Sequence, residues 1–476
     1  MTQLHDLTAL EQGEMIAAGK LSPVELTQHY LDRIGQLNDT VGAFVTVTPE
    51  LALGQAAQAE TDATEARREG RALSPLHGVP VPVKDLNFVA GVKATLGSLA
   101  YAENVPLVDD HVVTRLRQSG TVMLGKTQTP EFGLPCYSEN KIAAPARTPW
   151  DLDRSAGGSS GGAGAAVSSG LAPLAHGSDG GGSIRIPASV CGLYGIKPSR
   201  GRVASGPTFY DVSGLSTSGP LARTVADAAA LLDVLAGSMP GEPYAAPSLP
   251  AGETFRAYAQ REPGVLRVAV LTSSPAPGVT VHSDCVAATR ETAELLTGLG
   301  HHVEELDLPA DDTLRTVFGQ VWAVMATQTP VAPEDEEKLM PLTRHLRKLG
   351  REVSGPDFAT ALYAFRAVGL LVSQLQAAYD VILSPTLAQP PAPVGGLRND
   401  ADPASEFDSL VHFTPFTPLY NATGQPAVNL PLHWNADGLP IGVMLGGRYG
   451  DEATLISLSA QLEAARPWAG RKPSVW

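Results

Sequence analysis

Apolar residues recur at helical spacing near the start of the chain. Residues 22–25 read Ser-Pro-Val-Glu, a capping box with proline at the first helical position. The apolar stripe that follows consists of Leu26, Tyr30, Leu31, Ile34 and Leu37. Such a stripe indicates a helix that packs on its own domain or takes part in a subunit contact. We therefore predict a helical segment over residues 1–65.

From about residue 72 the pattern changes to short valine-rich strands that alternate with helices. Residues 121–124 and 267–271 are predicted to be buried strands, and residues 112–118 and 284–299 are predicted to be helices. This alternation is typical of an α/β protein with a largely parallel or mixed sheet.

Composition narrows the class of protein. The chain has 476 residues, of which 43% are hydrophobic and 17% charged, so it can bury a large core. Its net charge of −15 argues against a nucleic-acid or anionic-membrane partner. Three scattered cysteines fit a reducing compartment. Because neither a signal peptide nor an apolar run of about 18 residues is found, we expect a cytoplasmic protein without a membrane span.

Two glycine-rich cassettes each contain a serine. Ser159 lies in Gly-Gly-Ser-Ser-Gly-Gly (157–162), and Ser183 lies in Gly-Ser-Asp-Gly-Gly-Gly-Ser-Ile-Arg-Ile-Pro-Ala-Ser (177–189). Glycines let a backbone approach a substrate closely and leave N–H groups free to face a developing negative charge. The two hydroxyls are therefore candidates for a nucleophile and a proton relay.

Lys84 is the candidate base. A serine is a poor nucleophile until a base takes its proton, and a lysine can be that base only when burial keeps it neutral. Lys84 follows an apolar run (78–83), and on a strand it would point away from the neighbouring Asp85. The alternative is a lysine at a strand end that reaches solvent. Because the lysine and both serines would have to share one sheet, we favour a single large domain.

Two literal motif matches suggest other functions. Residues 120–127 satisfy the P-loop pattern G-x-x-x-x-G-K-[ST], but their middle positions are themselves a predicted strand, so the strand interpretation is favoured. Residues 157–161 satisfy G-x-S-x-G, the nucleophile elbow of α/β-hydrolases, with His412 or His433 as the histidine. The elbow leaves the second cassette unexplained.

No metal-ligand histidine spacing is found, and neither cassette contains a dinucleotide motif. We therefore expect no metal and no cofactor.

Lys84 and the two cassettes together resemble the amidase signature family. The segments that also look like family segments are 131–133, 149–151, 192–198, 219–225, 421–427 and 438–442. The resemblance implies a catalytic domain over residues 66–476, with a mixed central sheet covered by helices on both faces. Helices like those of residues 1–65 are often used in dimer contacts in this family, which leaves a homodimer open.

The resemblance also implies a mechanism and a small-molecule amide substrate. In such enzymes the residue matching Ser183 is the acyl-forming nucleophile, and the residue matching Lys84 is the neutral base. The residue matching Ser159 relays the proton and follows a cis peptide after the residue matching Gly158. The implied reaction hydrolyses an amide bond and releases a carboxylate and ammonia or an amine.

The second cassette is implied to hold the oxyanion hole. Its donors would be the backbone N–H groups of Gly180, Gly181, Gly182 and Ser183, each of which is typically worth about 10²–10³ in rate. We interpret Asp179 and Arg185 as an ion pair or hydrogen-bonding frame that shapes this loop.

Two positions depart from the family pattern. Gly180 stands where many members carry a larger residue, which leaves either a looser oxyanion loop or a wider pocket. Ile186 stands where the amidase subunit of the tRNA-dependent glutamine amidotransferase usually has glutamine. The second departure and the negative charge favour a stand-alone hydrolase, with a subunit of a multi-subunit amidotransferase as the alternative.

The sequence does not identify the amide. Specificity in this family lies in variable segments, which here are 131–138, 205–216 and 315–345. The aromatic residues in them that could line a pocket or belong to the core are Phe132, Tyr137, Phe209, Phe318 and Trp322. Small aliphatic amides, aryl acylamides, cyclic amides and peptide C-terminal amides are all left open.

Overall fold

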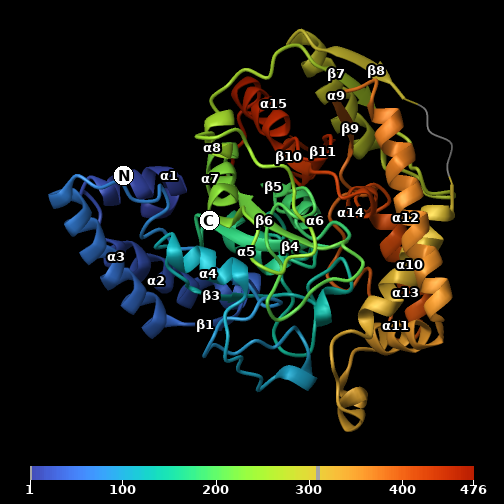
Figure 1. Ribbon diagram of the computed structural model, residues 1–476, viewed down its shortest axis with the longest axis horizontal. Coiled ribbons are helices and arrows are strands. Elements are labelled where there is room, and N and C mark those ends of the chain that lie inside the picture. Colours follow the sequence, from blue (N-terminus) through green and yellow to red (C-terminus); the bar gives the residue numbers. More distant parts are fainter. Residues whose placement is uncertain (1–2, 307–310) are drawn as a thin grey trace.

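The computed structural model describes residues 3–306 and 311–476, which form a large mixed sheet with helices on both faces and a smaller sheet beside it (Figure 1). The large sheet has the strand order β4-β6-β5-β10-β11-β9-β7-β8. Strand β7 runs parallel to β8 and β9, and the other neighbouring pairs are antiparallel. The predicted α/β class with a mixed sheet is confirmed. Its strands are β4 (Leu174–Asp179), β5 (Tyr194–Lys197), β6 (Thr217–Ala222), β7 (Arg267–Val270), β8 (His302–Glu305), β9 (Val381–Pro385), β10 (Ala427–Trp434) and β11 (Pro440–Gly446).

Adjacent residues of β5 identify the helices on the two faces. The hydroxyl of Tyr194 bonds Ser459 of α15 at 3.0 Å, whereas a Cβ on Gly195 would lie 2.8 Å from Ala188 of α6. Because neighbouring strand residues point to opposite faces, α15 and α6 cover opposite sides of the sheet. The helices are α1 (Ala9–Ala17), α2 (Pro23–Val41), α3 (Pro49–Glu69), α4 (His111–Gln118), α5 (Gly161–Ser168), α6 (Arg185–Val190), α7 (Val225–Leu235), α8 (Phe255–Tyr258), α9 (Ser283–Gly298), α10 (Thr313–Ala326), α11 (Pro341–Glu352), α12 (Gly355–Gln376), α13 (Pro403–Phe413), α14 (Pro418–Thr423) and α15 (Glu452–Ala465). Short 3-10 turns are η1 (Leu4–Asp6), η2 (Leu99–Tyr101), η3 (Glu131–Gly133) and η4 (Pro333–Lys338).

The small sheet carries Lys84 to the edge of the large one. It has the order β1-β3-β2, with β1 (Phe44–Val47), β2 (Val83–Lys84) and β3 (Gly125–Thr127). The amide of His176 in β4 donates to Pro82 O at 3.2 Å, which holds the chain leading into β2 beside β4.

The strand predicted over residues 121–124 is displaced. These residues are buried, and Val122 makes one bridge with Pro80, but the ladder itself begins at Gly125. The apolar pattern correctly predicted that these residues are buried. It could not predict where the ladder begins, because that depends on pairing with the distant strand β1. The strand predicted over 267–271 and the helices predicted over 112–118 and 284–299 are confirmed as β7, α4 and α9 to within one residue at each end.

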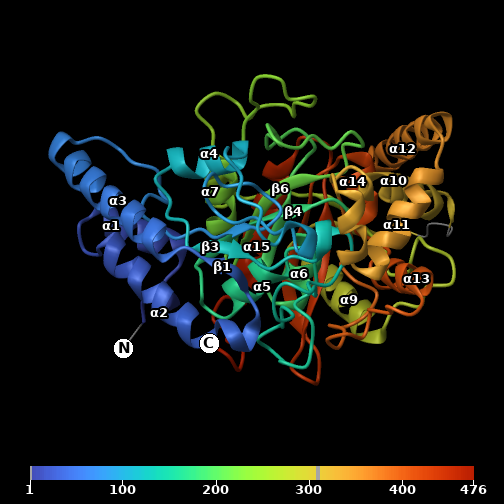
Figure 2. The same ribbon diagram turned by 90° about the horizontal axis from the view of Figure 1, so that it is seen from below.

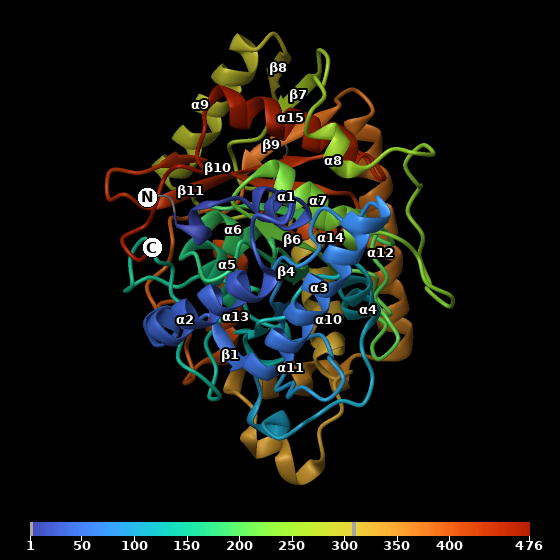
Figure 3. The ribbon, with the colours of Figure 1, turned by 90° about the vertical axis from the view of Figure 1, so that its left-hand side faces the viewer.

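The N-terminal helices form one flank of the molecule and α10 to α13 form the opposite flank (Figures 1 and 2). Figure 3 looks onto the first flank, where α1, α2 and α3 lie in front of the sheet. Ser22 caps α2, since its hydroxyl accepts from Val24 N at 3.1 Å and from Glu25 N at 3.3 Å, but the described residues show no reciprocal bond from Ser22 N to the Glu25 side chain, so the predicted capping box is only half formed. The segment is not wholly helical, because it contains β1, and residue 65 falls inside α3.

One described helix, α12, is long and apolar enough to cross a membrane by length and composition alone. In the fold it packs on α10 and α14, and its outer surface exposes Tyr363, Leu370 and Leu371.

Glu463 of α15 predicts a pH-dependent contribution to stability. Its carboxylate accepts from Val225 N, at the start of α7, and burial raises its pKa to about 7. The unfolded value is about 4.3, so between these pH values the folded state holds the extra proton and stability falls as pH rises. We expect Glu463→Gln to remove this dependence, which is at most about 4 kcal/mol.

Urea unfolding of both proteins at pH 5 and pH 8 measures this effect. Relative to the parent, the variant should have a higher free energy of unfolding at pH 8 than at pH 5. An equal pH dependence of the free energy of unfolding in the two proteins would contradict the assignment.

Candidate active site

Lys84 is buried at the end of β2 and faces the first serine cassette. Its Nζ lies 2.8 Å from Ser159 Oγ, and it donates to Ser178 Oγ at 3.0 Å and to Ser178 O at 3.2 Å. The side chain has no exposed surface. Ser178 in β4 was missed by sequence reasoning, although it lies inside the second cassette.

Burial lowers the pKa of the Lys84 ammonium into the range where the neutral amine is populated near pH 7. Desolvation lowers the pKa of Lys84 to about 7, against the opposing effect of the Asp179 carboxylate. Asp85 points away and bonds Lys126 Nζ at 2.8 Å and Thr95 N at 2.9 Å. The predicted opposite orientation of Lys84 and Asp85 is confirmed, and no carboxylate contacts the lysine within the described residues.

The two serine cassettes are held against each other. The amide of Ser160 donates to Ser183 O at 3.2 Å, and both serine side chains are nearly buried, with 2% of Ser159 and 6% of Ser183 exposed. The peptide between Gly158 and Ser159 is cis. A Cβ on Gly158 would lie 2.7 Å from the backbone of Tyr137, so only glycine fits there.

Asp179 and Arg185 form the ion pair expected beneath the second cassette. Arg185 Nη2 donates to Asp179 Oδ1 at 2.9 Å and Nε donates to Oδ2 at 3.0 Å, with both side chains fully buried. Burial raises the pKa of Asp179, but the Arg185 guanidinium and further hydrogen bonds outweigh it and hold this pKa well below its usual range.

Two residues far along the chain complete this frame. Asn421 Nδ2 donates to Asp179 Oδ1 at 2.9 Å, and Arg185 donates to Thr417 O at 2.9 Å. The hydroxyl of Thr417 donates to Gly181 O at 2.7 Å. Sequence reasoning assigned no role to either residue, although the family-like segment at 421–427 was a signal for Asn421.

The prediction that Gly182 supplies an oxyanion donor is wrong in this structure. Its N–H donates to Asp179 Oδ1 at 2.7 Å and is therefore already used. Glycine is needed there for another reason, because φ is +135° and a Cβ would lie 2.4 Å from Thr417 Oγ1. The N–H groups of Gly180, Gly181 and Ser183 have no acceptor in the described part of the chain and are the available donors.

The space beside Gly180 is occupied by an aromatic ring rather than left open. A Cβ there would meet Trp322 at 3.3 Å, and a Cβ on Gly181 would meet Phe318 at 3.1 Å. The two rings come from α10 and stack with centroids 5.1 Å apart. The glycine at position 180 therefore makes room for Trp322.

The other aromatic residues of the variable segments lie elsewhere. Tyr137 is a core residue that donates a hydrogen bond to Glu406, and Phe209 is exposed. Phe132 packs edge-on against Tyr101, with ring centroids 5.9 Å apart.

The P-loop interpretation is excluded by the surroundings of Lys126. This lysine lies in β3, is fully buried and is paired with Asp85, so it is not available to a phosphate. The elbow interpretation also fails, because the partner of Ser159 is Lys84. The imidazole of His433 bonds Glu291 at 3.2 Å, and neither it nor His412 bonds Ser159.

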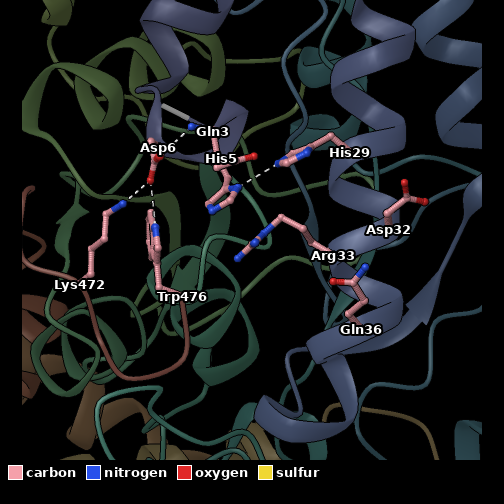
Figure 4. Close-up of a pocket in the computed structure, with 9 residues that line it drawn as sticks. All are labelled: Gln3, His5, Asp6, His29, Asp32, Arg33, Gln36, Lys472 and Trp476. Atoms are coloured by element: carbon pink, nitrogen blue, oxygen red, sulfur yellow. Dashed lines mark hydrogen bonds and ion pairs between the residues drawn. The ribbon is translucent and has the colours of Figure 1, made fainter. Parts of the chain in front are cut away.

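A hollow of about 540 Å³ lies where α2 meets the last residues of the sequence (Figure 4). Its polar groups bind one another: His5 Nδ1 lies 3.0 Å from His29 Nε2, and Asp6 accepts from Trp476 Nε1 at 3.0 Å and from Lys472. Its lining contains none of the catalytic candidates, so we place the site at the cassettes. The described residues contain no cluster of three metal-ligand side chains.

Comparisons with known proteins agree with this geometry. The family model described as Amidase matches residues 25–456. AmiB2 of Mycobacterium tuberculosis is 39% identical over 100% of this chain and 99% of its own. A solved 6-aminohexanoate cyclic dimer hydrolase has a TM-score of 0.91 at 32% identity, with 100% of both chains covered. A bacterial aryl acylamidase of the amidase signature family has a TM-score of 0.87 at 26% identity, covering 99% of this chain and 100% of its own.

Proposed function

The chain belongs to the amidase signature family, and we propose that Ser183, Ser159 and Lys84 are its nucleophile, proton relay and base. The protein is a hydrolase of carbon–nitrogen amide bonds. The observation that supports these roles best is the buried contact of 2.8 Å between Lys84 Nζ and Ser159 Oγ.

The proposed reaction has two stages. Neutral Lys84 takes the proton of Ser159, Ser159 takes the proton of Ser183, and Ser183 Oγ attacks the amide carbonyl. The N–H groups of Gly180, Gly181 and Ser183 stabilise the resulting oxyanion. The relay then protonates the leaving nitrogen, the C–N bond breaks and an acyl-enzyme forms. Water attacks the acyl-enzyme by the same proton route and releases the carboxylate.

Hydrolysis of a graded panel of amides by the purified protein tests this function. The panel holds simple aliphatic, aryl and cyclic amides, each assayed with and without EDTA. We expect turnover of at least one class and no loss with the chelator. Loss of activity on chelation would contradict the serine–lysine mechanism.

We propose further that the chain acts without a partner subunit in the cytosol. Ile186 is 2% exposed, and a Cβ on Gly157 would meet its side chain at 3.1 Å, so this position serves packing below the cassettes. The three cysteines are unpaired and buried, as suits a reducing compartment. Activity of the single purified chain tests this proposal, and dependence on a second copurified chain would contradict it.

The pH profile should follow Lys84. Because the lysine must be neutral to act, kcat/KM should fall as pH drops through about 7 and level off at higher pH. Burial also lowers the pKa of Lys197 to about 7, so this second lysine must be distinguished from Lys84. We expect Lys197→Met to keep the midpoint of the profile. A kcat/KM that is flat from pH 5 to 10, or a midpoint near pH 7 that disappears in Lys197→Met, would contradict the role of Lys84 as the base.

A further inference from the structure

The three segments that are expected from the sequence to hold the specificity meet at the oxyanion loop, residues 179–183. A Cβ on Gly180 would lie 3.3 Å from Trp322 of segment 315–345 and 3.9 Å from Ser216 of segment 205–216. The indole N–H of Trp322 donates to Leu134 O, in segment 131–138, at 3.2 Å. Trp322 therefore touches the oxyanion loop with its benzo ring and the 131–138 segment with its nitrogen.

The 131–138 segment also borders the relay serine. A Cβ on Gly133 would lie 3.3 Å from Ser159 Oγ, so the backbone next to Leu134 passes directly by the relay serine. Because Trp322 bonds Leu134 and packs on Gly180, it connects the 131–138 segment to the loop that carries Ser183.

The ring is itself well supported. It stacks on Phe318 at 5.1 Å and 21°, and Phe318 packs in turn on Phe365 of α12 at 6.4 Å. The side chains that Cβ atoms on the loop glycines would meet are all uncharged: Trp322, Ser216, Phe318, Thr417 and Ile186. The charged groups of the loop, Asp179 and Arg185, are paired with each other and fully buried.

We propose that Trp322 and Phe318 form the acyl-binding wall of the amidase and select amides with an uncharged, apolar acyl group. This inference rests on the proposed nucleophile at Ser183. A Cβ on Gly180 would lie 3.3 Å from the Trp322 ring, so the ring would have to shift by a few tenths of an ångström to accept a larger residue there. A carboxylate in the acyl group would be desolvated against the rings, and none of the described side chains that Cβ atoms on the loop glycines would meet carries a positive charge to pair with it.

A double-mutant cycle between Gly180→Ala and Trp322→Leu tests the shared space. We expect Gly180→Ala to lower kcat/KM by roughly 10- to 100-fold in the parent, and by less than about threefold in the Trp322→Leu background, where the added methyl group has room. Independent effects of the two changes would overturn the proposal. If Gly180→Ala does not fold, the parallel cycle of Gly181→Ala with Phe318→Leu applies the same criterion.

Acyl selectivity is the second readout, measured on hexanoyl, acetyl and succinyl p-nitroanilides. The parent should have a higher kcat/KM for the hexanoyl than for the succinyl anilide. Trp322→Leu should lower kcat/KM for the hexanoyl anilide by roughly 10- to 100-fold, mainly by raising KM. The same change should lower kcat/KM for the acetyl anilide by less than about threefold. Trp434→Leu is the matched control, because Trp434 packs on Trp150 away from the loop. Equal losses on all three substrates, or the same change of selectivity in the control, would overturn the proposal.

Fluorophosphonate labelling of each variant separates this inference from the function on which it rests. A parent that carries no adduct on Ser183 contradicts the proposed nucleophile, and with it the acyl-binding wall. A parent labelled at Ser183 that shows independent mutational effects or unchanged selectivity contradicts the wall alone.

Discussion

Ser183→Ala should abolish amide hydrolysis, lowering kcat/KM by roughly 10⁴- to 10⁶-fold. The variant keeps the oxyanion donors and the contact between Lys84 and Ser159, but it has no atom that can form the acyl-enzyme. Its fold should be unchanged, because the structural bond of this residue is made by its backbone O, which accepts from Ser160 N. Initial rates and a thermal unfolding scan of both proteins check these expectations.

Covalent labelling identifies which serine is the nucleophile. A fluorophosphonate should leave its mass on the peptide that carries Ser183, and Ser183→Ala should take up no label. Ser159→Ala should react slowly but still at Ser183, because only the route to Lys84 is cut. Mass spectrometry of the labelled peptides reads out the position, and an adduct on Ser159 in the parent would reverse the assigned roles.

The features of this site that lie within a short stretch of chain were predictable from the residues, whereas the roles of Lys84 and the two serines were implied by the family resemblance. Each serine lies within a cassette whose glycines are required by nearby backbone, as the 2.7 Å approach of a Gly158 Cβ to Tyr137 illustrates. The orientation of Lys84 away from Asp85 followed from strand periodicity alone. The pairing of Asp179 with Arg185 spans six positions of one cassette and was likewise predictable.

The parts that sequence reasoning missed depend on contacts between distant positions. Asn421 reaches Asp179 across 242 residues, and Thr417 reaches Gly181 across 236. The glycine at position 180 suggested a loose loop or a wide pocket, because the sequence does not reveal that Trp322 fills the space. The use of the Gly182 N–H by Asp179 is a matter of loop conformation, which composition does not determine.

The prediction of strand boundaries was also limited by contacts between distant positions. Residues 121–124 are as buried as a strand would be, yet the ladder begins at Gly125 because its partner is β1, from the N-terminal segment. That partner was missed because β1 is only four residues long and lies between the two helices α2 and α3. The consequence matters for function, because β3 also pairs with β2 and so helps to position Lys84.

Lys84→Met should lower kcat/KM by roughly 10²- to 10⁴-fold, because methionine fills the same buried space but cannot accept the proton of Ser159. The loss should come with no fall in stability, since burial already disfavours the charged lysine, as its lowered pKa indicates. Lys84→Arg should be inactive up to pH 10, because a guanidinium stays protonated.

The control is Lys93→Met, which removes a half-exposed lysine paired with Glu103 and should keep full activity. Rates, fluorophosphonate labelling and urea unfolding of all four proteins provide the measurement. A Lys84→Met enzyme within tenfold of the parent would show that another group takes the proton from Ser159.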